Sequence, residues 1–260
     1  YSAIRIQKFN ESVDAQIAFT EVKEVFGKES RIELSKKNGL RIDINRQNVD
    51  TQKFIRTETG LTLGFGYNFM SGDNLDINDF SYPNNNYFAL GYQWKTSLDK
   101  ETNNFRLLYG VEYQSQGTEL NGNRFFTQGD ETQIAPIGFN VDKAKFRQDQ
   151  LVFPVSLEFG GSNRKDYDDG RVRFDDFDKW KIGIGGFVGF NMSSRLKLKY
   201  ELDGRDIKET RVNNFDNEKF LYGIDAYIGH GEVHFFGRMN LNNVFNNNSV
   251  DAQYISFGIR

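Results

Sequence analysis

From residue 61 to residue 260 the chain repeats short segments in which large apolar residues alternate with glycine or polar residues. The segments LTLGFGYNF (61–69) and YISFGIR (254–260) are two examples. Successive side chains of a strand project to opposite faces, so each segment has one apolar face and one small or polar face. This pattern predicts strands of a barrel whose outside meets lipid and whose interior is polar.

Eight such segments follow residue 54, an even number, as bacterial single-chain barrels have. The stretches between them are rich in Asn, Asp, Gly and Ser, which favour turns and loops. The predicted fold class is all-β: an eight-stranded antiparallel transmembrane up-and-down β-barrel with long extracellular loops, which include 114–149 and 192–218. The expected strand cores are 58–70, 86–97, 104–117, 150–160, 179–191, 219–229, 232–243 and 251–260.

The apolar faces of these segments carry no charge. A Lys or Arg at the bilayer midplane of a barrel costs about 2–4 kcal/mol, so this absence is required of lipid-facing positions. Both tryptophans fall at the ends of segments that this topology places on the periplasmic side, where an interfacial girdle of aromatic residues is expected. The predicted girdle consists of Trp94, Trp180, Tyr67, Tyr113, Phe190 and Tyr222.

The opposite faces hold the charged residues. The interior of an eight-stranded barrel is just wide enough for side chains to fill it, so these groups are expected to pair with one another. We predict an ion-pair cluster of Glu112, Glu158, Arg238 and Asp225 in the lumen. Structural pairs that plug the barrel are favoured over a path for protons or solutes.

Composition narrows the choice of function. The 260 residues are 38% hydrophobic, which resembles a soluble protein, but only every second residue of a barrel strand faces lipid. The chain contains no run of about 18 apolar residues, so no transmembrane helix is predicted. The net charge of −3 and the scattered basic residues argue against a nucleic-acid partner. The absence of cysteine excludes thiol chemistry.

Candidate chemistry is sparse. The glycines of GIGGFVG (183–189) lie within a predicted strand and open no helix, so they are not a dinucleotide-binding motif. His230 and His234 flank a turn, and the acidic stretch DYDDG (166–170) lacks the spacing of a calcium loop. His234 with Glu232 is the best candidate for a lipid-modifying enzyme, yet no nucleophile accompanies it. We therefore predict no catalytic residue, no metal and no cofactor.

The chain divides into residues 1–53, which do not fit the barrel, and residues 54–260, which form it. The first part is predicted to be a periplasmic extension with a helix from Ser12 to Gly27 and a hairpin turning at Asn38 and Gly39. A plug in the lumen is the alternative place for it. The link 161–178 is long for a periplasmic turn, and an extra hairpin or a partner contact would explain it. The chain begins at Tyr1 without Met, from which we expect a processed or truncated N-terminus.

Several segments resemble the PorT-type outer-membrane β-barrel family of Bacteroidota. These are LVFPVSLEFG (151–160), GIGGFVGFNMSSRLKLK (183–199), FLYGIDAYIGHGEVHFFGRMNLNNVF (220–245) and the terminal YISFGIR, with GVEYQSQG (110–117) resembling the third strand. Two departures are Glu158, where a basic residue is expected, and the final Arg260 in place of an aromatic residue. The resemblance implies a link to type IX secretion or to outer-membrane biogenesis machinery.

The predicted function is that of a non-enzymatic component of an envelope assembly in the Gram-negative outer membrane, with both termini periplasmic. Its expected partners are outer-membrane lipids and other envelope proteins, without nucleic acid. A small pore or an adhesin that uses the loops is one alternative, and a lipid-modifying enzyme is another. A soluble barrel that binds a ligand among inward-facing aromatic residues is a further one.

Overall fold

The computed structural model describes residues 23–25, 28–35, 39–43, 53–73, 75–99, 101–168, 170–246 and 250–260. Apart from two short 3-10 turns, the regular elements in these ranges are strands. None of the helical segments in the described part of the chain has the length and apolar character needed to span a bilayer. The protein is therefore all-β, as the sequence predicted.

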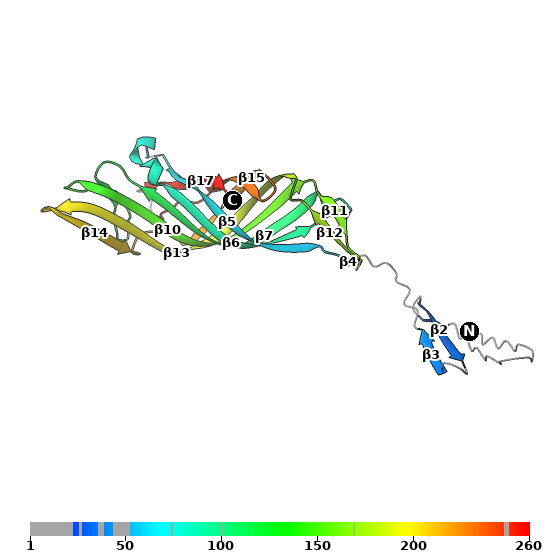
Figure 1. Ribbon diagram of the computed structural model, residues 1–260. Coiled ribbons are helices and arrows are strands. Elements are labelled where there is room, and N and C mark those ends of the chain that lie inside the picture. Colours follow the sequence, from blue (N-terminus) through cyan, green and yellow to red (C-terminus); the bar gives the residue numbers. More distant parts are fainter. Residues whose placement is uncertain are drawn as a thin grey trace, which may run out of the picture. The chain divides into compact units, whose positions relative to one another are not determined.

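Eight antiparallel strands form a closed ring of hydrogen bonds (Figure 1). Each strand pairs with the next along the ring, and β17 pairs with β5 to close it. All eight coincide with predicted strand cores, so the alternating pattern located each of them correctly. The strands are β5 (Thr57–Ser71), β6 (Asn86–Ser97), β7 (Phe105–Glu119), β10 (Val141–Gly160), β13 (Trp180–Leu202), β15 (Phe220–His230), β16 (Val233–Asn240) and β17 (Gln253–Ile259).

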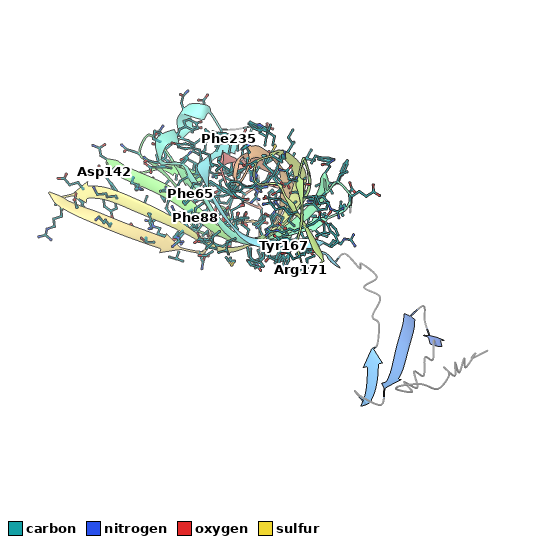
Figure 2. All side chains as sticks on the ribbon, turned by 45° about the vertical axis from the view of Figure 1, so that its right-hand side comes forward. Phe65, Phe88, Asp142, Tyr167, Arg171 and Phe235 are labelled. Carbon is teal, nitrogen blue, oxygen red and sulfur yellow. The ribbon has the colours of Figure 1, made fainter. Side chains whose placement is uncertain are left out.

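The apolar faces point outward and the polar faces point into the ring. In β15, exposed and buried positions alternate without exception, with Tyr222 and Ile224 exposed and Asp225 and Tyr227 buried. Phe65 and Phe88 are paired neighbours on this outward face (Figure 2). The alternative barrel, with these aromatic faces turned inward around a ligand, differs from the structure, in which they point outward.

Three strands project beyond the ring at one end (Figure 1). β10 and β13 continue past their predicted cores as a pair, and β14 (Arg205–Val212) turns back along β13. Figure 2 places Asp142 near the far end of this projecting sheet. The prediction that 114–149 and 192–218 are loops is wrong for much of their length, because Val141–Asp149, Met192–Leu202 and β14 are strand.

Connections at this same end pack over the ring. They contain η1 (Ile77–Asp79), η2 (Tyr82–Asn84), β8 (Arg124–Phe126) and β9 (Ile134–Pro136). Their apolar side chains join those of the strand ends in a buried cluster, which we call the cap cluster. Its members are Met70, Phe80, Leu120, Phe126, Ala144, Phe146, Leu196, Leu198, Phe215, Val244, Phe245, Val250, Ala252 and Tyr254.

The link 161–178 folds as a hairpin at the other end of the ring, which agrees with one of the two explanations given for its length. β11 (Asn163–Asp166) pairs with β12 (Arg171–Asp175), and β4 (Lys53–Phe54) adds a third strand. Phe174 is buried and meets the ring of Phe54 edge-on at 5.6 Å. The nearby turn between β15 and β16 consists of Gly231, at φ +64°, and Glu232, one residue later than predicted.

By its internal contacts the chain divides into a unit of 1–53 with 168–170 and a unit of 54–167 with 171–260. In the first unit, β1 (Lys23–Val25), β2 (Lys28–Ser35) and β3 (Gly39–Asp43) form an antiparallel sheet. β2 and β3 pair as a hairpin, but the predicted turn position is wrong at Gly39, which is the first residue of β3 and pairs with Ser35, while Asn38 lies outside the described ranges. The predicted helix is wrong over 23–25, which is strand, and residues 12–22 lie outside the described ranges.

Candidate functional site

The interior of the ring holds the four residues predicted as one ion-pair cluster, but they belong to separate groups. Arg238 pairs with Glu112, whereas Glu158 pairs with Arg106. Asp225 lies 3.7 Å from Arg260 and accepts a hydrogen bond from Ser156. The prediction that charges fill the interior is correct for these residues, and the prediction that Glu158 shares a cluster with Arg238 is wrong.

The central group is built around Arg238 of β16. Its guanidinium is buried, and its Nη1 atom lies 2.5 Å from Glu112 Oε1 and donates to Tyr87 Oη at 2.9 Å. It also donates to Gln114 and lies 4.9 Å from the centre of the Phe187 ring. Groups from three other strands, β6, β7 and β13, thus converge on a single cation, and this fixes the spacing of opposite walls. Their side chains fill the middle of the ring.

A second group lies toward the hairpin end. The Arg106 Nε atom donates to Glu158 Oε1 at 2.6 Å, and the Tyr227 hydroxyl donates to Glu158 Oε2 at 2.7 Å. Lys95 lies 3.9 Å from the same carboxylate. Both oxygens of this buried acid are therefore satisfied, as a charge removed from water requires. The sequence analysis missed Arg106 and Lys95 as partners of Glu158 because the sequence does not give the register between strands.

Asp176 joins this second group from outside the ring strands. It lies in the connection between β12 and β13, and its carboxylate accepts from Lys95 at 2.8 Å and pairs with Lys181 at 3.0 Å. Burial acts to raise the pKa of Asp176, but the two ammonium groups outweigh it and lower this pKa to about 2. A charged residue of the link therefore anchors the hairpin to the ring.

The open space in the ring is uneven. A cavity of about 550 Å³ lies at the hairpin end, and Lys95, Asp176, Lys181 and His234 are among its lining residues. Farther in, the space between Tyr87, Glu112 and Arg238 is only about 10 Å³. A single water molecule needs about 10–15 Å³, so this space holds no more than about one water molecule.

Beyond the central group, the interior is occupied by hydrogen-bonded amides and hydroxyls, and the bond from Gln116 to Ser256 spans it. Gln114 donates to Gln150 at 2.7 Å, Gln116 donates to Ser256 at 3.0 Å, and Ser256 donates to Asn68 at 2.7 Å. The cap cluster follows directly after these bonds and buries Phe126, Phe146 and Tyr254. The interior is therefore obstructed at its centre and covered by apolar side chains at the projecting end.

The six residues of the predicted girdle lie on the outward face of the ring. Trp94 and Trp180 occupy the hairpin end, where Trp180 forms the last pair of β13 with β15. Tyr113, Phe190, Tyr222 and Tyr67 lie toward the projecting end, and the ring of Tyr67 is 6.2 Å from that of Phe257. Two aromatic levels therefore bound the apolar face.

A basic surface on the projecting sheet was missed by the sequence analysis. We call it the basic ladder, because cations of β10, β13 and β14 stand opposite one another in successive rows. Burial, together with Arg147 and Lys143 nearby, lowers the pKa of Lys145 to about 8. The ladder consists of Lys143, Lys145, Arg147, Arg195, Lys197, Lys199 and Lys208.

The pair of residues considered for an enzyme is not assembled. His234 packs its ring 5.3 Å from that of Tyr227, and its buried Nε2 atom has no hydrogen-bond partner among the described residues. Glu232 lies in the adjacent two-residue turn and accepts no hydrogen bond from this ring. In the described part of the chain, no hydrogen bond therefore links His234 to Glu232 as the enzyme alternative would require.

Comparison with known proteins found no matching family model, no matching curated protein and no matching solved structure. The functional conclusion therefore depends on the geometry of this chain.

Proposed function

We propose that the chain is an eight-stranded outer-membrane β-barrel that conducts no solutes and serves as a non-enzymatic component of an envelope assembly. The observation that carries this proposal is the combination of an uncharged apolar exterior with an obstructed interior. The exterior argues for lipid around the ring, and the interior argues against transport through it. What remains for function is the surface that the barrel offers to other molecules.

The exterior supports a membrane location on energetic grounds. Leu61, Trp180 and Phe235 expose 80%, 66% and 63% of their surfaces, and similar side chains cover every strand of the ring. Monomeric soluble proteins rarely expose contiguous apolar patches larger than a few hundred Å². In a bilayer the same surface is favourable, because a barrel satisfies all backbone groups between its strands.

The topology supports an assignment of each end of the ring to one side of the membrane. The first ring strand starts and the last one finishes at the end that carries the hairpin, and the two termini of such barrels lie in the periplasm. The hairpin, Trp94 and Trp180 are then periplasmic, and the cap cluster and the projecting sheet are extracellular. This orientation gives long outer connections, as bacterial barrels have, and short periplasmic turns except for the link 161–178.

The proposed role in an assembly has two supports: the geometry argues against a pore and against an enzyme, and the sequence resembles the PorT-type family. A ring with an obstructed interior is a poor pore, and the His234 region is a poor active site. The resemblance implies type IX secretion or outer-membrane biogenesis as the setting, and this remains a prediction.

Two measurements on the same preparation test the proposal. Protein extracted from native outer membranes in mild detergent is expected to give no conductance steps in planar bilayers, with a trimeric porin as the positive control. Mass spectrometry of the extract is expected to find defined envelope proteins at stoichiometric levels. Steady ohmic channels would overturn the obstructed barrel, and a clean monomer would overturn the assembly role. Absence from the membrane fraction would overturn both.

A further inference from the structure

Seven cations on the projecting sheet share one face. Leu196 and Leu198 point inward to the cap cluster, so the alternate residues Arg195, Lys197 and Lys199 point outward. The strand register then sets like charges opposite one another. Arg147 pairs with Arg195, Lys145 pairs with Lys197, and Lys143 pairs with Lys199, which in turn pairs with Lys208.

This arrangement is unfavourable without a counter-charge, since like charges directly opposite one another destabilise a sheet. Three carboxylates lie within 4 Å of the ladder: Asp149 at Arg195, Asp142 at Lys199 and Glu119 at Lys143. Among the described residues, neither Lys197 nor Lys208 has an acidic partner within that distance, and both are exposed. Glu201 and Asp206 form the next row on the same face, so the seven cations of the ladder face five carboxylates and keep a net positive charge.

Two of the cations are held in place. Lys145 Nζ donates to the Asn84 carbonyl oxygen at 2.7 Å, and its stem lies against Gly117, where a Cβ atom would be 2.6 to 2.8 Å from its neighbours. Arg147 donates to Asn86 Oδ1 at 3.2 Å. Part of the positive surface is therefore preorganised, which lowers the entropic cost of binding an anion.

The ladder begins where the apolar exterior ends. Leu151, Phe190 and Phe220 form one outward row across β10, β13 and β15. Arg147 lies four residues farther along β10, which is about 13 Å at roughly 3.3 Å per residue. A barrel tilted in the usual way then sets the ladder at the height of the headgroups, just outside the hydrocarbon layer.

We propose that the basic ladder binds the phosphate groups of lipids in the outer leaflet, so that the projecting sheet lies on charged headgroups. This inference rests on the proposed membrane location. Clusters of Lys and Arg next to an apolar membrane surface attract anionic headgroups by about 1 kcal/mol each. The continuity of cations with the apolar row favours a lipid over an acidic protein, which would have no need of that row.

The test measures binding of lipid A, a lipid with two phosphate groups, to the full-length protein in dodecyl maltoside. The variant K197Q/K199Q/K208Q removes the exposed Lys197 and Lys208 and the half-buried Lys199, whose ion-pair partner Asp142 is exposed. The variant R164Q/K165Q/K179Q changes the net charge equally at the hairpin end and serves as the control. Inorganic phosphate and polyglutamate are titrated in parallel, and insertion of each protein into phosphatidylcholine vesicles is measured by flotation.

The expected result is that the ladder variant binds lipid A roughly a hundredfold more weakly than the wild type, at about fivefold per cation, while the control stays within about threefold. Equal binding by the ladder variant would overturn the proposal, as would competition by millimolar inorganic phosphate or tighter binding of polyglutamate. Flotation distinguishes failure of the lipid-binding inference from failure of the proposed membrane location. Insertion without lipid A binding overturns this inference alone, and failure to insert overturns the membrane location itself.

Discussion

Gly183 shows how tightly the interior of the ring is packed. A Cβ atom at this position would lie 2.0 Å from the nearest carbon of the Tyr227 ring. That ring holds a hydroxyl against Glu158, so it cannot move without breaking a buried hydrogen bond. We expect Gly183→Ala to lower the free energy of unfolding by about 1–3 kcal/mol, as overpacking does. Chemical unfolding in detergent, followed by tryptophan fluorescence, measures the change.

Gly237 offers the matched control, since a Cβ atom there would meet nothing within 4 Å. Gly237→Ala has the same effect on the unfolded chain and is expected to change the free energy of unfolding by less than about 1 kcal/mol. Similar losses in both variants would show that the Tyr227 ring has room to move and that the interior is looser than described.

Asp176 gives the protein an acid-sensitive contact. Its pKa in the folded protein is about 2, below the ordinary value of 3.8, because Lys95 and Lys181 outweigh the effect of burial. The stabilisation is therefore complete above pH 4 and is lost as the pH falls toward 2, and it amounts to about 2 kcal/mol. We expect the wild type to lose this much more stability than Asp176→Asn between pH 5 and pH 2. Parallel unfolding curves for the two proteins across this range would contradict the assignment.

Which residues point inward could be predicted, but which of them meet could not. The period of two places Glu112, Glu158 and Arg238 on polar faces without any knowledge of the fold. The partners of each depend on strand register and on tilt, which alternation leaves open. Asp176 was harder still, because it belongs to a connection whose path into the ring has no signature in the sequence.

Among the elements, the hairpin of β11 and β12 depends on few apolar contacts. Phe174 supplies the main one, and replacing a buried Phe by Ala costs about 3–5 kcal/mol. We expect Phe174→Ala to let the hairpin open and to raise the rate of tryptic cleavage after Arg171 and Arg173 by about a hundredfold or more. Mass spectrometry of the fragments over time provides the measurement.

Phe177 lies in the same link and is 58% exposed, so Phe177→Ala makes the same chemical change without removing a buried contact. Its cleavage rates should stay within a few-fold of the wild type. If the Phe174 variant is also no faster than this, Asp176 and the strand pairing alone hold the hairpin.

The projecting sheet is the element that sequence reasoning assigned wrongly. Its strands alternate as the others do, with Leu196 and Leu198 between Arg195, Lys197 and Lys199. The exposed face is charged instead of apolar, and that pattern was taken for a loop because only an apolar face had been expected of a strand. A search for alternation of apolar with any polar residue would have found the ends of β10 and β13, but not β14, whose two apolar residues, Ile207 and Val212, do not alternate.

At the scale of the whole molecule, two obstructions lie in series. The Arg238 group fills the centre, and the cap cluster covers the projecting end. We expect the variant E112A/R238A to remain silent in planar bilayers, because the cap cluster still separates the interior from the outside. Conductance steps in this variant would show that the apolar cap admits ions and that the central group alone prevents leakage.

The seam between β5 and β17 also constrains the order of folding. Ser256 and Asn68 are hydrogen-bonded across it and lie 188 residues apart in the chain. Contacts between such distant residues form slowly, and until they form both strands present open edges that invite aggregation. Ring closure must wait until the last strand has been synthesised. The unfinished chain is therefore expected to depend on a holding chaperone until the ring closes.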